Sequence, residues 1–111
     1  MPRLDLSDFV TRLDRAVRRS SPTFPFFFTA VGPTTVRVTC KEGAVVGIVT
    51  REAAWINDQR CRYMDMGTKQ IGTRVERAEN KSNSWWIDVV AERLIGGLEG
   101  FKQWSSEKEM T

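Results

Sequence analysis

Residues 35–50, TVRVTCKEGAVVGIVT, decide the fold of this chain. In the first half of this stretch apolar and polar side chains alternate, which is the period-two pattern of a β-strand. The apolar side chains that share one face are Val36, Val38 and Cys40. Glu42 and Gly43 supply a tight turn, and residues 44–50 return as an antiparallel partner. The stretch therefore predicts a β-hairpin.

The returning strand at residues 44–50 is apolar on both faces. One face is expected to carry Val45 and Val49, and the other Val46 and Ile48. A strand with one face exposed to solvent alternates between apolar and polar residues. Because residues 44–50 do not alternate in this way, both faces of this strand should be covered. Helices cover one side, and the other side requires a curled sheet or a second copy of the protein. We therefore predict a dimer in solution, with an interface near Phe26, Phe28 or Val45.

An amphipathic helix is expected at about residues 6–20. Asp5 or Ser7 can cap its start, and the Ser-Ser-Pro sequence at 20–22 ends it. Its apolar side chains recur at helical spacing and form one stripe. The stripe comprises Leu6, Phe9, Val10, Leu13, Ala16 and Val17.

A second helix is expected at about residues 84–104, before a polar tail at 105–111. Its apolar stripe comprises Ile87, Val90, Ala91, Leu94, Leu98 and Phe101. Gly96, Gly97 and Gly100 fall inside this pattern. Each glycine costs about 1 kcal/mol relative to alanine in a helix, so the helix should kink or end near them.

Shorter stretches of the sequence predict the remaining strands. Residues 24–31 are aromatic-rich, and Pro25 among them indicates a strand start or a sheet edge. Residues 51–59 are predicted to form a loop or short helical turn that carries Trp55. Residues 60–66 and 70–78 are predicted to form the two strands of a second hairpin.

Together these elements predict an α+β fold of the form α-β(4–5)-α. An antiparallel sheet of four to five strands occupies about residues 24–79, and both terminal helices pack on one face of it. The length of 111 residues suits a single domain at 1–111.

Several features predict a cytoplasmic protein without a membrane partner. No apolar run follows the basic residue near the N-terminus, as a secretory signal requires. No stretch approaches the roughly 18 consecutive apolar residues of a membrane span. Cys40 and Cys61 lie in different segments without CxxC spacing, which favours reduced thiols over a disulfide.

The absence of histidine from the sequence argues against most enzyme chemistries. It removes the commonest general acid–base and metal-ligand residue. The sequence accordingly predicts no catalytic residue, no metal site and no cofactor. Two alternatives remain open: a carboxylate pair of Asp58 and Asp65, and a reactive Cys61 activated by the arginines on either side of it. An inward-facing strand cysteine is the simpler interpretation of Cys61.

Basic and aromatic residues suggest binding instead. Residues 1–41 carry seven basic and three acidic side chains, and the chain contains four tryptophans. Arginine suits phosphate and carboxylate partners, and tryptophan is enriched at interfaces. The candidate binding surface comprises Arg12, Arg15, Arg19, Arg37, Trp55, Arg60, Arg62, Tyr63, Arg74, Trp85 and Trp86.

Two questions about these residues stay open. The arginine flank of the first helix either forms a free basic patch or pairs with the acidic flank of the second helix. That acidic flank comprises Asp88, Glu92 and Glu99. At least one of the tryptophans at 85, 86 and 104 should be partly exposed.

The leading functional hypothesis is a small non-enzymatic protein–protein interaction module, an adaptor, accessory subunit or inhibitor that forms a homodimer. The alternative is a protein that binds RNA or single-stranded DNA through its arginines and sheet aromatics. A small enzyme without histidine chemistry comes third.

Overall fold

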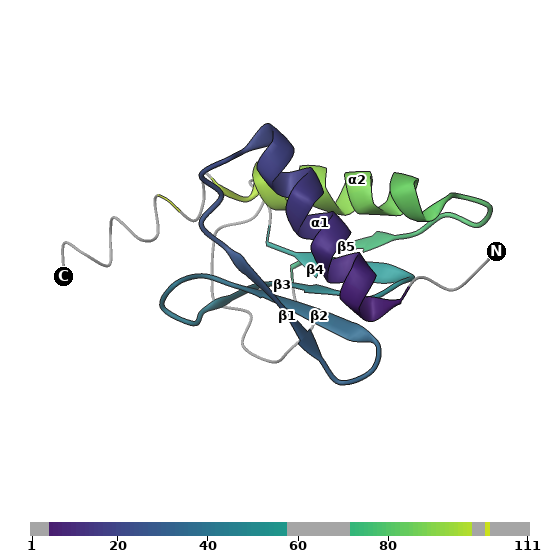
Figure 1. Cartoon of the computed structure of the whole chain (residues 1–111), viewed down its shortest axis with the longest axis horizontal. Helices are drawn as coiled ribbons and strands as arrows, with labels where there is room; N and C mark the ends of the chain where they lie inside the picture. Colours follow the sequence, from purple (N-terminus) through teal and green to yellow (C-terminus); the bar gives the residue numbers. More distant parts are fainter. Residues whose placement is uncertain (1–4, 58–71, 99–101, 103–111) are drawn as a thin grey trace.

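The structure, a computed structural model, describes residues 5–57, 72–98 and 102. Within these residues, two helices and one five-stranded sheet form an α-β5-α arrangement (Figure 1). The elements are α1 (Leu6–Ser20), β1 (Phe27–Val31), β2 (Thr35–Thr39), β3 (Val45–Val49), β4 (Ala53–Ile56), β5 (Thr73–Glu76) and α2 (Asn83–Gly96). The predicted α+β fold with terminal helices is confirmed.

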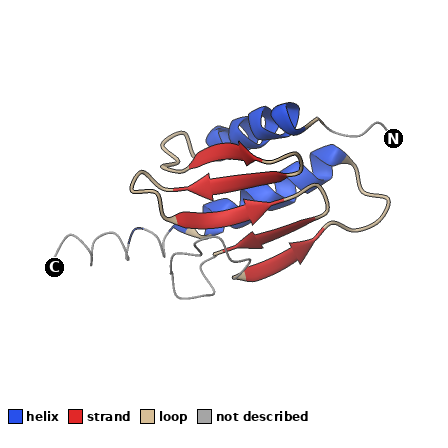
Figure 2. Ribbon diagram, turned by 90° about the horizontal axis from the view of Figure 1, so that it is seen from below, coloured by secondary structure: helices blue, strands red, loops and turns tan. Residues whose placement is uncertain are grey.

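The strands form an antiparallel meander in the order β1-β2-β3-β4-β5. Both helices lie on the same face of this sheet, as the view from below shows (Figure 2). Helix α1 contacts β1 and β2, whereas α2 contacts β4, and the two helices pack against each other. The molecule therefore has two layers, with the main core between them.

Buried side chains of α1, β2, β3, β4 and α2 fill the main core between the layers, and the partly buried Phe28 of β1 and Val75 of β5 pack against it. The α1 stripe is confirmed, because Phe9, Leu13 and Val17 are fully buried. From the sheet, Val36 and Val38 of β2 face the same core. Removing this apolar surface from water is the main driving force for the packing of α1 onto the sheet.

Helix α2 begins and ends where local chemistry requires. The Ser82 hydroxyl caps its start by accepting a hydrogen bond from the backbone N–H of Trp85 at 3.0 Å. Its last residue is Gly96 and its C-cap is Gly97, in agreement with the glycine pattern. Neither α1 nor α2 is long and apolar enough to cross a membrane.

Strand β3 is buried along its whole length, but its faces differ from those predicted. A register shift leaves Val46 as an extra residue between two adjacent pairs with β2. This β-bulge reverses the alternation. Val46 and Val49 consequently face the main core, while Val45 and Ile48 form a second cluster with Trp55. The predicted pairing of Val45 with Val49 on one face is wrong for this reason.

Residues 53–56 form strand β4, so the prediction of a loop or helical turn there is wrong. The chain reverses through Thr50, whose backbone N–H donates to the carbonyl of Ala53 at 2.8 Å. The Thr50 hydroxyl also accepts from the backbone N–H groups of Glu52 and Ala53. Strand β5 lies inside the predicted strand at 70–78 and pairs with β4. The predicted strand at 60–66 lies outside the described residues.

Candidate functional site

The face of the sheet opposite the helices carries a row of cross-strand neighbours from all five strands. In register order the row is Thr29, Arg37, Ile48, Trp55 and Arg74. We call the surface around this row the far face. Directly opposed residues of antiparallel strands have their side chains on the same face, within about 5 Å at Cβ. Three residues of the predicted binding surface, Arg37, Trp55 and Arg74, are thus brought together.

The two arginines of the far face do not form a continuous basic stripe. The guanidinium of Arg74 lies over the Trp55 ring, 5.2 Å from its centroid, and pairs with the Glu76 carboxylate at 2.9 Å. Arg37 has no ion pair among the described residues. Between them, Ile48 is only 6% exposed. The cations are therefore separated by apolar and aromatic surface, and one of them already has a carboxylate partner.

Strand β1 forms one edge of the sheet and has an unpaired outer side. In the part of the chain that the structure describes, its backbone makes no hydrogen bond beyond those with β2. Phe27, at the start of the strand, is 53% exposed and is the one large hydrophobic side chain described as exposed. An edge strand presents a row of free N–H and C=O groups. We call this part of the surface the β1 corner. It comprises the outer backbone of Phe27–Val31 and the ring of Phe27.

The two edge strands of the sheet, β1 and β5, differ in the charge of their side chains. Strand β5 carries the charged side chains of Arg74 and Glu76. Strand β1, with the sequence FFTAV, carries no charge. Just before it, the Arg18 guanidinium donates to the carbonyl oxygens of Phe24 at 2.8 Å and Phe26 at 3.2 Å. Backbone groups preceding β1 are thus satisfied within the chain, and the open edge begins at Phe27.

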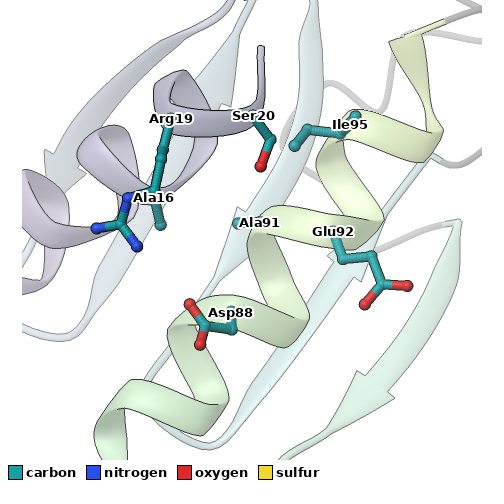
Figure 3. A pocket seen from close by; sticks show the side chains of 7 residues that line it. All are labelled: Ala16, Arg19, Ser20, Asp88, Ala91, Glu92 and Ile95. Atoms are coloured by element: carbon teal, nitrogen blue, oxygen red, sulfur yellow. The ribbon is translucent and has the colours of Figure 1, made fainter.

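A groove runs between the two helices on the outside of the helical layer (Figure 3). One hollow of about 410 Å³ in it is lined by Ala16, Arg19, Ser20, Asp88, Ala91, Glu92 and Ile95. A second hollow of about 200 Å³ is lined by Arg12, Arg15, Ala16, Arg19, Ser84, Ile87 and Asp88. The cationic wall comes from α1 and the anionic wall from α2.

The structure therefore brings the arginine flank of α1 opposite the acidic flank of α2. No ion pair joins the two flanks within the described residues. Arg12 instead donates to the Ser84 hydroxyl at 2.9 Å. Asp88 and Glu92 still lower the positive potential of the groove, because opposite charges at short range attract and offset each other. Glu99, the third residue of the predicted acidic flank, lies outside the described residues.

The tryptophans divide between core and surface. Trp86 is fully buried, and its indole N–H donates to the carbonyl oxygen of Thr50 at 3.1 Å. Of the predicted binding residues, Trp86 is therefore one whose side chain the structure places in the core. Trp85 is partly exposed, lies 6.4 Å from the Trp86 ring, and has the Lys81 ammonium 5.6 Å from its centroid.

Several predicted residues fall outside the described part of the chain. They are Asp58, Arg60, Cys61, Arg62, Tyr63 and Asp65. Cys40 is a buried free thiol. Over residues 5–57 and 72–98, no group of three or more potential ligand side chains is placed to hold a metal ion.

Phe27 is the surface residue that the sequence prediction missed. Pro25 correctly indicated a sheet edge, but phenylalanines at 26, 27 and 28 leave both faces of the strand aromatic. The structure buries Phe26 and leaves Phe27 outside. Comparison of the chain with models of protein families, with curated proteins and with solved structures finds no match in any of the three.

Proposed function

We propose that the chain is a non-enzymatic protein–protein interaction module that binds its partner at the β1 corner. The observation that supports this proposal is the edge of β1, which is uncharged and makes no hydrogen bond on its outer side among the described residues. An extended segment of a partner adds there as a sixth strand. Strand addition of this kind is a recurring mode of protein recognition, in which backbone hydrogen bonds give affinity and side chains give specificity.

The exposed Phe27 ring gives this edge a side-chain anchor. Full burial of a wholly exposed phenylalanine contributes about 1.5–3 kcal/mol, and Phe27, which is 53% exposed, can contribute about half of that. Each backbone hydrogen bond to an added strand contributes about 0.5–1.5 kcal/mol net. Several such terms add over the five residues of β1 and together offset the entropic cost of association.

The charge distribution gives less support to nucleic-acid binding. Arg37 and Arg74 are separated on the far face, and Arg74 pairs with Glu76. The α1 arginines stand opposite carboxylates in the groove. Binding to a phosphate backbone depends on several cations that are free to displace counterions. The charges described here favour a protein partner over a nucleic acid.

The test compares two variants that each raise the net charge by two. Phe27→Lys/Thr29→Lys alters the β1 corner, because lysine on an edge strand opposes strand addition. Glu79→Lys, at an exposed position after β5 and at the other end of the sheet from β1, is the matched control. Wild type and both variants are immobilised and exposed to an extract of the source cells, and retained proteins are quantified by mass spectrometry.

We expect at least one protein to be retained by wild type and control but lost from the β1 variant. Circular dichroism and urea unfolding establish that all three proteins are folded. Retention of the same proteins by all three would contradict the proposal, because binding would then be independent of the β1 corner.

A further inference from the structure

We propose that the β1 corner binds a second copy of the chain, so that two β1 strands pair antiparallel about a twofold axis at Thr29. This inference rests on the proposed function and names its partner. A twofold interface is self-complementary, because the same patch is used on both subunits. The sequence of strand β1 must then allow it to pair with β1 of the second copy.

An axis at Thr29, the middle residue of β1, uses all five residues of the strand. It places Phe27 opposite Val31 of the second copy on the far face. On the helix side it places Phe28 opposite Ala30 of the second copy, a large side chain against a small one. Aromatic and β-branched side chains opposed across antiparallel strands contribute about 0.2–1 kcal/mol beyond an alanine pair. Both faces of the joined sheet are thus complementary.

Electrostatics does not oppose this pairing. The FFTAV sequence of β1 places no like charges opposite each other. The nearest cation of the described sheet is Arg37, directly beside Thr29 on β2. Two copies of Arg37 would be three strand spacings apart, about 14 Å. That separation exceeds the Debye length of about 8 Å at physiological ionic strength, so their repulsion is screened.

The helical layers of the two copies would also meet in the joined sheet. Helix α1 packs over β1 and β2, so the two copies of α1 would lie beside each other and run antiparallel. The flank of α1 that faces away from the groove carries Asp14 and Arg18, which form an ion pair at 2.9 Å. The two charges of this flank are thus balanced within each copy. Strand β1 thus lacks the charged side chains with which natural edge strands prevent self-association.

The first experiment is sedimentation velocity on the full chain from about 1 µM to about 200 µM, a range that covers weak to moderate interfaces. We expect wild type and Glu79→Lys to dimerise at tens of micromolar. Phe27→Lys/Thr29→Lys should dimerise at least tenfold more weakly. Dimers of equal strength in all three proteins would overturn the inference, since the interface would lie elsewhere.

The second experiment tests the register by disulfide formation in a Cys61→Ser background. Residues directly opposed in an antiparallel pair have Cα atoms about 4.5–5.5 Å apart, within the range for a disulfide. Thr29→Cys should therefore cross-link rapidly to its own copy, whereas Ala78→Cys, exposed after β5 at the opposite edge of the sheet, should not. Equal cross-linking rates would overturn the register at Thr29.

These outcomes separate the partner from the proposed function. A wild type that stays monomeric at about 200 µM overturns self-pairing. If proteins are still captured through the β1 corner in that case, the interaction module stands with a different partner. If that capture also fails, both proposals fall.

Discussion

The indole N–H of Trp86 donates a hydrogen bond to the backbone carbonyl of Thr50 across 3.1 Å. Trp86 lies in the first turns of α2, and Thr50 directly follows β3. The bond therefore joins the C-terminal helix to the turn between β3 and β4. Because the Trp86 ring is fully buried, this contact combines packing with a hydrogen bond in a region shielded from water. It fixes the position of α2 over the sheet.

Replacement of Trp86 by phenylalanine removes this hydrogen-bond donor and leaves the Thr50 carbonyl without its indole partner. We expect a loss of about 1–3 kcal/mol in the free energy of unfolding, measured by urea denaturation. Trp85→Phe is the matched control, because its ring is partly exposed and its indole makes no hydrogen bond among the described residues. The control should lose less than about 1 kcal/mol. Equal losses would show that the indole hydrogen bond contributes nothing.

Leu13→Ala tests the packing of α1 against the sheet. Leu13 is fully buried in the main core. Large-to-small changes at such positions cost about 2–5 kcal/mol, because the lost transfer energy adds to that of the cavity. Arg15→Ala, at an exposed position on the same helix, should stay within about 0.5 kcal/mol of wild type. A loss below about 1 kcal/mol for Leu13→Ala would contradict the observed burial.

The helices and the first hairpin were predictable because their signals are local. Apolar side chains at helical spacing, such as Phe9 and Leu13, define the buried face of α1 without reference to any other segment. The faces of β3 were not predictable, since they depend on a bulge at Val46 that exists only in the pairing with β2. Strand β4 was missed because the preceding turn depends on Thr50 and contains neither glycine nor proline.

The same distinction applies to the candidate site. Arg37, Trp55 and Arg74 were identified from residue type alone, yet only the strand register shows that they lie in one row. Trp86 has the same residue type as Trp85, and only its contact with the sheet places it in the core. Phe27 was missed because its exposure depends on the orientation of an edge strand whose two faces are both aromatic.

Thr50→Val tests whether a side chain forms the turn into β4. Valine keeps the shape of threonine but lacks the hydroxyl that accepts from the backbone N–H groups of Glu52 and Ala53. Loss of these bonds should cost about 1 kcal/mol in the free energy of unfolding. Thr50→Ser retains the hydroxyl and should preserve more of the stability than Thr50→Val. The reverse order of the two variants would mean that the apolar methyl group, and not the hydroxyl, stabilises this turn.

Asp88→Lys tests the charge balance of the groove between the helices. It puts a positive charge opposite the α1 arginines, so we expect a loss of up to about 1 kcal/mol at low salt. The loss should shrink in high salt, because exposed charges are screened. Glu79→Lys, exposed before α2 and away from the groove, is the charge-matched control and should show a smaller loss. Equal losses would mean that net charge alone, and not the facing flanks, sets the effect.

A direct pairing of Arg19 with Asp88 can be measured separately with a double-mutant cycle. No ion pair joins these residues within the described structure. The coupling energy from Arg19→Ala and Asp88→Ala should therefore stay below about 0.5 kcal/mol, the low end for exposed pairs. A larger coupling would show that the two flanks pair in solution.

Binding of a fluorescent single-stranded oligonucleotide tests the alternative function. We expect a Kd weaker than about 10⁻⁴ M at physiological salt, the weak end of ordinary non-specific binding. The physical reason is that Arg74 is engaged by Glu76, while apolar Ile48 separates it from Arg37. Tighter binding that falls steeply with salt would contradict this expectation. In that event, Arg37→Ala/Arg74→Ala should make the salt slope shallower by up to about 2 units if these arginines contact phosphates. Trp55→Ala should instead cost about 1–3 kcal/mol with little change in slope if a base stacks on the indole.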